Sequence, residues 1–122
     1  MSEKVEFWGY ELRINCRACD INAVTNPEII KEFVKELVSE IDMVAFEEPR
    51  IVHFGHPPTT GYTLDQLIET SNITAHFCDQ NGNAYFNIFS CKPFDPESAM
   101  AVVKQFFKPE KMAWDFTTRD AD

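Results

Sequence analysis

The dipeptide Asn81-Gly82 restricts the possible folds of this chain more than any other feature. It lies between two stretches rich in β-forming residues, 70–77 and 84–91. Asn-Gly is a preferred centre for the tight turn that joins two antiparallel strands, because both residues tolerate positive φ. We therefore expect these two stretches to form a β-hairpin.

Two amphipathic helices begin with sequences of the same kind. Asn26-Pro27-Glu28 and Asp95-Pro96-Glu97 each supply an N-cap, a proline at the first helical position and an acid in the first turn. Apolar residues then recur at helical spacing in both segments: Ile29, Ile30, Phe33, Val34, Leu37 and Ile41 in the first, and Ala99, Val102, Val103 and Phe106 in the second. We expect the second helix to end near Lys108-Pro109, because proline cannot continue a helix.

Further strands are expected at 10–16, 43–54 and 111–117. The first alternates apolar and polar residues, as a strand with one wet face does. The segment 55–67 is the least regular and is expected to be a loop beside the hairpin. The resulting order, β-α-β-β-β-α-β, predicts the α+β class: a two-layer sandwich whose antiparallel sheet carries two helices on one face. Its 122 residues are expected to form a single domain, 1–122.

Composition excludes some classes of function. A formal net charge of −9 argues against a nucleic-acid surface. No apolar stretch is long enough to span a membrane, and the first residues lack the pattern of a signal peptide. We therefore expect a cytoplasmic protein, in which the four cysteines are thiols.

Two sets of residues invite a metal or redox interpretation. Cys16 and Cys19 form a CxxC motif, but the other two cysteines supply no second CxxC at the spacing of a zinc site. His53, His56 and His76 lack an HExxH pattern or a partner carboxylate at a metal-ligating spacing. We expect a structural role for both sets and no metal.

A polar cluster is predicted on the hairpin. Ser71 and His76 belong to its first strand, Cys91 ends its second, and Thr63 lies upstream. Pairing about Asn81-Gly82 predicts that Ser71, His76 and Cys91 are neighbours. Residues an odd number apart face opposite sides of a strand, so Ser71 and His76 share a side only if a bulge intervenes. The cluster alone is explained either by a structural network or by a reactive serine.

At these residues the chain resembles the prokaryotic S-adenosylmethionine decarboxylases, small pyruvoyl-dependent enzymes of polyamine synthesis. The family has a Ser-His-Ile-Ser-Ile-His type strand, which is matched by the six residues from Ser71 to His76. A Phe-Thr-Cys type motif is matched by Phe89-Ser90-Cys91, with the cysteine twenty residues beyond the serine. The Gly-Cys-Asp end of the family's first strand corresponds to Ala18-Cys19-Asp20.

The resemblance implies self-cleavage between Thr70 and Ser71. The serine hydroxyl attacks the preceding carbonyl, with His76 as base and Thr63 assisting, and a pyruvoyl group forms from Ser71. This cofactor forms a Schiff base with the substrate amine and accepts electrons when CO₂ leaves. Cys91 corresponds to the family's proton donor. The resemblance also implies a homodimer that supplies the aminopropyl donor for spermidine synthesis.

This chain departs from the family pattern around the cleavage site and the substrate. Thr70 replaces a common glutamate, which we expect to be tolerated because that residue contributes mainly its carbonyl. Cys78 and Gln80 replace an aromatic and an acid that resemble groups contacting the nucleoside. We expect Phe54, Phe77 and Gln80 to bind substrate, with Phe46 and Tyr62 as other sources of a stacking ring. The alternatives are a pyruvoyl decarboxylase of ornithine or arginine, and an unprocessed paralogue that binds or regulates an active enzyme.

Overall fold

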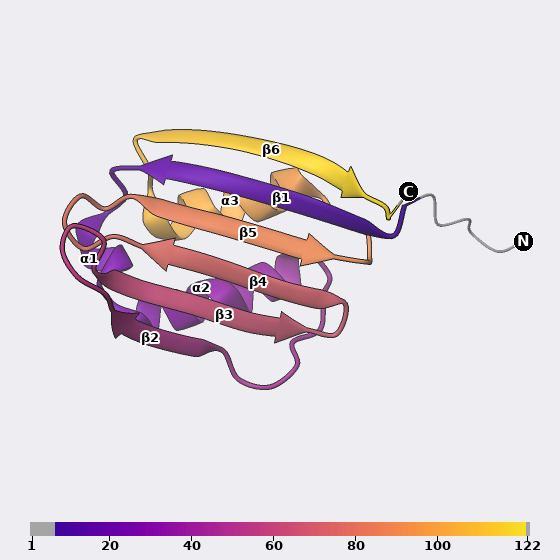
Figure 1. Ribbon diagram of the computed structural model, residues 1–122, viewed down its shortest axis with the longest axis horizontal. Helices are drawn as coiled ribbons and strands as arrows, with labels where there is room; N and C mark the ends of the chain where they lie inside the picture. The colour runs from indigo at the N-terminus through magenta and orange to yellow at the C-terminus, as the bar shows by residue number, and fades with distance from the viewer. Residues whose placement is uncertain (1–6, 122) are drawn as a thin grey trace, which may run out of the picture.

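A computed structural model describes residues 7–121. Residues 7–121 form six strands and three helices (Figure 1). In order, these are β1 (Gly9–Arg17), α1 (Ile21–Val24), α2 (Pro27–Glu40), β2 (Arg50–Phe54), β3 (Gly61–Ile68), β4 (Ser71–Phe77), β5 (Ala84–Ser90), α3 (Pro96–Phe107) and β6 (Lys111–Arg119).

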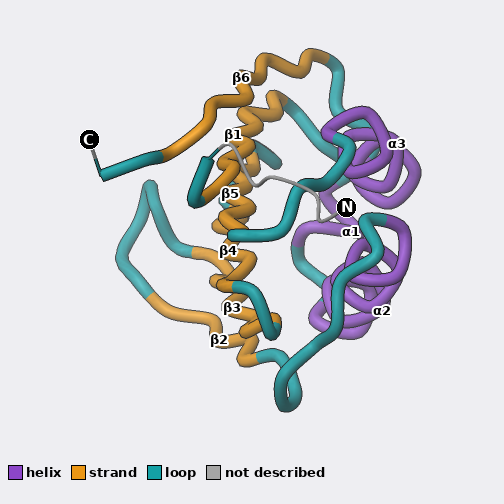
Figure 2. Tube along the Cα trace, turned by 90° about the vertical axis from the view of Figure 1, so that its right-hand side faces the viewer, coloured by secondary structure: helices purple, strands orange, loops and turns teal. Residues whose placement is uncertain are grey.

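The strands form one antiparallel sheet in the order β2-β3-β4-β5-β1-β6. In the described part of the chain, all three helices lie on the same side of it, and the opposite face carries no helix (Figure 2). The predicted fold class, a two-layer α+β sandwich with an antiparallel sheet, is confirmed. We refer to the uncovered side of the sheet as the open face.

Both long helices begin as the sequence predicts. The Asn26 side chain accepts the Glu28 N–H at 3.0 Å, and the Asp95 side chain accepts the Glu97 N–H at 3.0 Å. Helix α3 ends at Phe107 and is capped by Lys108, which takes a left-handed conformation with φ of 48° immediately before Pro109. These caps set where each helix starts and stops over the sheet.

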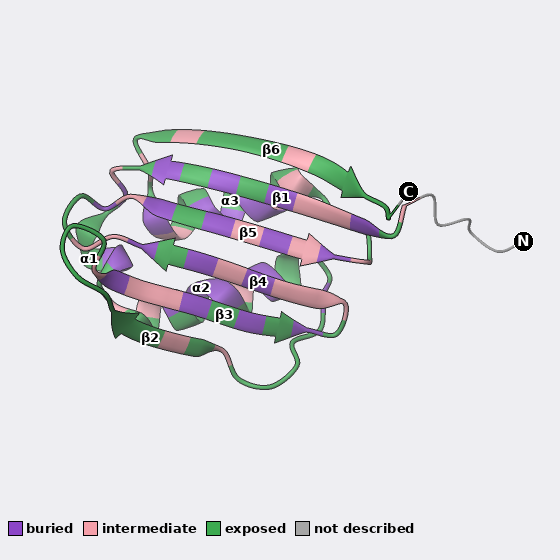
Figure 3. Cartoon of the chain, in the orientation of Figure 1, coloured by how far each residue is buried: buried purple, intermediate pink, exposed green. Residues whose placement is uncertain are grey.

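Aromatic side chains fill the layer between helices and sheet, where buried positions alternate along the strands (Figure 3). Phe33 of α2 packs on Phe107 of α3 with ring centroids 4.8 Å apart, and on Phe86 of β5 at 5.4 Å. Phe77 of β4 contacts Phe86 and Phe107. Such edge-to-face and tilted contacts hold the helices on one face of the sheet.

Three local expectations are corrected. Residues 61–68 form strand β3 although the segment 55–67 was expected to be irregular, and only 50–54 of the expected 43–54 strand is regular apart from a bridge at Ala45. The short helix α1 was not predicted. Strand β3 was missed because Gln66 interrupts its apolar face. Gln66 is only 2% exposed, and its side chain donates to the carbonyls of Glu47 and Leu67, which makes its burial tolerable.

Within the described part of the chain, no helix is both long and apolar enough to cross a membrane.

Candidate active site

Ser71 follows a two-residue turn. Strands β3 and β4 pair up to Ile68 and Ser71, so Glu69 and Thr70 alone connect them. On its other side Ser71 pairs with Ser90, at the end of β5. The predicted cleavage site therefore lies in a tight turn where two interior strands of the sheet end.

The carbonyl before Ser71 is fixed by the residue that the family resemblance singles out. The backbone N–H of Cys91 donates to the Thr70 carbonyl oxygen at 3.0 Å. The Thr70 hydroxyl lies 2.7 Å from the hydroxyl of Ser90, which is fully buried. Ser71 and Cys91 are thus brought together, as the hairpin pairing predicts, and Thr70 lies with them.

His76 and Thr63 lie at the opposite end of β4. His76 Nδ1 is 3.2 Å from the Thr63 hydroxyl oxygen, across a directly paired position of β3 and β4. The pairing runs without a bulge from this position to Ser71. Five residues of strand separate the Cα atoms of Ser71 and His76 by about 16 Å. Within one chain, therefore, the expectation that His76 neighbours Ser71 is not met.

A cavity of about 470 Å³ lies at the His76 end of the sheet. Pro58 and Thr59 line one part of it, and the β4–β5 turn lines another. Cys78 Sγ donates to the Pro58 carbonyl at 3.2 Å, which ties these two walls together. A second hydrogen bond, of 2.6 Å, joins His53 Nε2 and Asp79 Oδ2. The complete lining is Pro58, Thr59, His76, Phe77, Cys78, Asn81, Asn83 and Tyr85.

The three expected substrate-binding residues have different environments. Phe54 lies on β2 and is 58% exposed. Phe77 lines the cavity but is only 3% exposed, because its ring packs in the core. Gln80 is exposed in the β4–β5 turn, beside the cavity-lining Asn81. Tyr85, which was not predicted, is 47% exposed and lines the same cavity.

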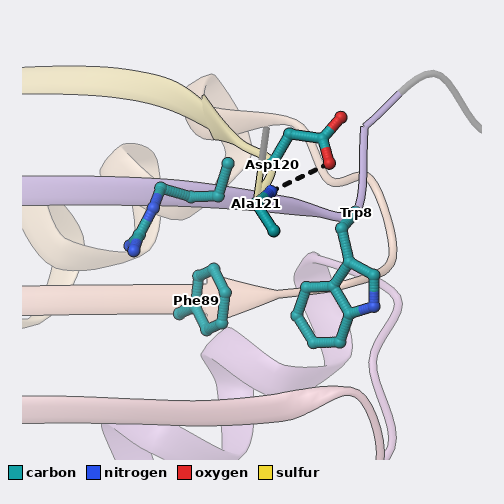
Figure 4. Close-up of a pocket in the computed structure, with 5 residues that line it drawn as sticks. Trp8, Phe89, Asp120 and Ala121 are labelled. Atoms are coloured by element: carbon teal, nitrogen blue, oxygen red, sulfur yellow. Dashed lines mark hydrogen bonds between the residues drawn. The ribbon is translucent and has the colours of Figure 1, made fainter.

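A second cavity, of about 340 Å³, lies toward the Ser71 end of the sheet. The rings of Trp8 and Phe89 stack with centroids 5.8 Å apart, and Asp120 and Ala121 complete the wall shown in Figure 4. The guanidinium of Arg119 lies 5.4 Å from the centre of the Phe89 ring. Phe89 pairs with Asn72, the residue after Ser71. An aromatic and cationic wall therefore adjoins the cleavage site.

Glu11 supports this wall from β1. Its carboxylate accepts the Asn87 side-chain N–H at 2.9 Å and the Arg119 guanidinium at 2.7 Å. The hydrogen bond from Asn87, followed by the interaction with Arg119, lowers the pKa of Glu11 below its usual value. Sequence reasoning missed Trp8, Glu11 and Arg119, because an alternating strand gives no sign of which polar residues pair across strands.

The CxxC residues are buried, with Cys16 3% and Cys19 5% exposed. A hydrogen bond between the two side chains, together with burial, raises the pKa of the Cys16 thiol. Among residues 7–121, no three or more His, Cys, Asp or Glu side chains gather as metal ligands would.

The fold and the turn define a class of protein: a small α+β sandwich with an open sheet face, in which a serine follows a tight turn with a fixed carbonyl. The family model described as S-adenosylmethionine decarboxylase matches residues 10–120, which is most of the chain. The chain therefore belongs to the S-adenosylmethionine decarboxylase family.

Several proteins similar to this chain carry the name of this family. The S-adenosylmethionine decarboxylase proenzyme of Clostridium botulinum strain Hall is 29% identical over 102 residues, covering 83% of this chain and 84% of the relative. The proenzyme of strain Loch Maree is 28% identical over the same coverage. The crystal structure of adenosylmethionine decarboxylase from Aquifex aeolicus VF5 superposes with a TM-score of 0.81 at 19% identity, covering 95% of this chain and 93% of that one.

Proposed function

We propose that the protein is a self-processing, pyruvoyl-dependent decarboxylase of S-adenosylmethionine. The observation that carries this proposal is the Thr70 carbonyl, held at 3.0 Å by the Cys91 N–H directly before Ser71, in a member of this family. The product, decarboxylated S-adenosylmethionine, is the aminopropyl donor for spermidine synthesis. The family relation does not favour a decarboxylase of ornithine or arginine or an unprocessed paralogue.

The first step is an acyl shift within the chain. The Ser71 hydroxyl oxygen bonds to the Thr70 carbonyl carbon, the carbon–nitrogen bond breaks, and the nitrogen takes up a proton. The product is an ester between Thr70 and Ser71. Elimination of the Thr70 carboxylate, followed by hydrolysis with loss of ammonia, leaves a pyruvoyl group at position 71.

The Cys91 N–H supports this step electrostatically. Negative charge develops on the Thr70 carbonyl oxygen during attack, and a fixed N–H stabilises such charge without having to reorient. The sheet supplies that fixed donor, because β5 is paired to β4 on one side and to β1 on the other.

The local residues also fit a pyruvoyl group at position 71. Strand β4 stays paired to β5 after cleavage of the turn, so the new N-terminus remains beside Cys91. The pyruvoyl carbonyl supplies an electron sink for the loss of CO₂ from a bound amine. We propose that the Cys91 thiol then delivers a proton to the α-carbon of the substrate.

The distance between Ser71 and His76 favours a site shared by two copies. His76 can act as the base for Ser71 only from another chain, and we propose that the partner subunit's His76 does so, assisted by the partner's Thr63. Two open faces packed about a two-fold axis place the His76 end of one sheet over the Ser71 end of the other. Exposed apolar residues on β2, β3 and β5 support such packing: Val52, Phe54, Leu67 and Tyr85.

This arrangement joins the two cavities into one composite pocket. We propose that the cavity beside Phe89 takes the part of the substrate nearest the reacting carbon, and that the partner's cavity takes the nucleoside. There Tyr85 or Phe54 supplies a stacking ring, and Gln80 a hydrogen bond to the ribose. All four cysteines are free thiols, as expected of an enzyme of the cytoplasm, where we propose that it acts.

Release of labelled CO₂ tests the proposed activity. The purified protein is incubated with S-adenosylmethionine, ornithine or arginine, each labelled at the carboxyl carbon, and Ser71→Ala serves as the control. We expect CO₂ from S-adenosylmethionine alone, and none from the Ser71→Ala variant. Release from ornithine or arginine instead would overturn the proposed substrate, and release by Ser71→Ala would overturn the cofactor.

A further inference from the structure

The side chain of Thr70 is anchored as firmly as its carbonyl. Its hydroxyl oxygen lies 2.7 Å from Ser90 Oγ and 3.4 Å from Met43 Sδ. Ser90 Oγ in turn accepts the backbone N–H of Lys92 at 2.9 Å and lies 3.7 Å from Met43 Sδ. Whichever hydroxyl donates to the other, the second can donate to the Met43 sulfur, so both protons have acceptors.

Thr70 is thus held at two points by the consecutive residues Ser90 and Cys91. Ser90 holds the side chain of Thr70, and Cys91 holds its carbonyl. Since the peptide bond is planar, fixing both points restrains the orientation of the whole Thr70–Ser71 peptide. That orientation decides whether the Ser71 hydroxyl can approach the carbonyl carbon.

The segment 90–92, which holds Thr70, is itself fixed by further contacts. Ser90 is fully buried, so water has little access to replace its hydrogen bonds. The ammonium group of Lys92 donates to the Asp42 carbonyl at 2.6 Å and to the Asp42 carboxylate at 3.2 Å. These contacts tie residues 90–92 to the end of α2, next to Met43.

We propose that Ser90 is a positioning residue for self-cleavage: through the Thr70 hydroxyl it holds the Thr70 carbonyl on the Cys91 N–H. This inference rests on the proposed cleavage at Thr70–Ser71 and gives the Thr70 side chain a role beyond its carbonyl. We call the Thr70–Ser90 side-chain contact and the Thr70–Cys91 backbone contact the clamp. Because the Thr70 and Ser90 hydroxyls are engaged in it, the Ser71 hydroxyl remains as the nucleophile. Within residues 7–121, no side-chain hydrogen bond engages Ser71.

Hydrogen exchange at the Cys91 amide tests the clamp independently of any cleavage. In a Ser71→Ala chain, which stays whole, we compare Thr70→Val and Ser90→Ala with Thr74→Val, a control on strand β4 away from these contacts. We expect Cys91 exchange to quicken about tenfold in the first two variants, as for the loss of one net hydrogen bond, and to stay unchanged in the control.

Amides of the interior strand β1, such as that of Ile14, separate a local effect from a global one. If Cys91 exchange is unchanged, or if it quickens only in step with Ile14, the clamp is wrong. Thr70→Ser keeps the hydroxyl and is expected to match the parent. If Ser90→Ala fails to fold, Thr70→Val alone decides the result.

The cleavage rate in chains that retain Ser71 completes the test. We expect Thr70→Val and Ser90→Ala each to slow the appearance of fragment 71–122 about tenfold, and the double variant to be no slower than either single variant. Cleavage of Thr70→Val at the parent's rate would overturn the positioning role. If the parent itself stays whole, the proposed function fails, while the Cys91 amide still decides whether the clamp exists.

Discussion

Cys91 contributes to the proposed chemistry in two ways. Its backbone N–H holds the carbonyl that is attacked during processing, and its thiol is the proposed proton donor during turnover. A side-chain substitution removes the second contribution and leaves the first, because every residue except proline has the same N–H.

The Cys91→Ala variant separates the two roles. We expect it to cleave at Thr70–Ser71 within about threefold of the parent's rate, and its turnover to fall by about 100-fold or more, since proton transfer by a placed group is typically worth that much. Gel analysis of cleavage and CO₂ release measure the two effects. Normal turnover by this variant would contradict the proposed donor.

The lowered pKa of Glu11 makes the free energy of unfolding depend on pH. Its lowered pKa, due first to Asn87 and then to Arg119, means that the folded chain favours the carboxylate. The stabilisation is complete above the unfolded-state pKa of about 4.3 and is lost as the pH falls through the lower folded-state value.

We expect Glu11→Gln to be about 1 kcal/mol less stable at pH 7 and to lose less stability on acidification below pH ~4. Urea unfolding from pH 3 to 7, in a Ser71→Ala background, gives both quantities. Glu32→Gln, on the exposed side of α2, is the matched control. Parallel stability curves for parent and Glu11→Gln would exclude this role.

At the scale of elements, the close pairing of β3 and β4 places the Thr63–His76 pair. Gly61 begins β3, where a Cβ atom would lie 1.7 Å from the carbonyl oxygen of Phe77. Only glycine permits that approach, because the neighbouring atom is backbone and has little room to move.

Gly61→Ala is therefore expected to lower the free energy of unfolding by about 2–3 kcal/mol, because an overpacked site forces the backbone to shift. Urea unfolding in the Ser71→Ala background measures the loss, and Thr117→Ala on the exposed edge strand β6 is the control. A Gly61→Ala chain as stable as its parent would show that the strands approach less closely than described.

The elements also show what the sequence can and cannot predict. The capped helices and the 71–90 hairpin follow from local rules, because Asn26, Asp95 and Asn81-Gly82 act on adjacent backbone. Strand β3 was not predictable in the same way, since its buried Gln66 is explained only by distant carbonyl partners. Likewise, residue spacing suggested that Ser71 and His76 are close, but their separation depends on an unbroken register with β3.

At the scale of the molecule, neither end of the sheet holds all four proposed catalytic residues. One end holds Ser71 and Cys91, and the other holds Thr63 and His76. We propose that a homodimer packed through its open faces supplies the missing half to each site.

Mixed dimers test this arrangement. His76→Ala chains expressed alone are expected to stay whole, and Ser71→Ala chains cannot cleave. In a mixed dimer, the His76→Ala chain meets the intact His76 of the partner subunit, so we expect it to cleave on co-expression. Mass spectrometry distinguishes its fragments. If His76→Ala chains stay whole when co-expressed, or if they cleave alone, the shared site is refuted.

The central claim is that this chain cuts itself before Ser71, and denaturing mass spectrometry of freshly purified protein tests it most directly. Our account predicts two fragments, residues 1–70 and 71–122, the second beginning with a pyruvoyl group, and a single intact chain for Ser71→Ala. A folded parent chain that remains whole after long incubation would contradict the account.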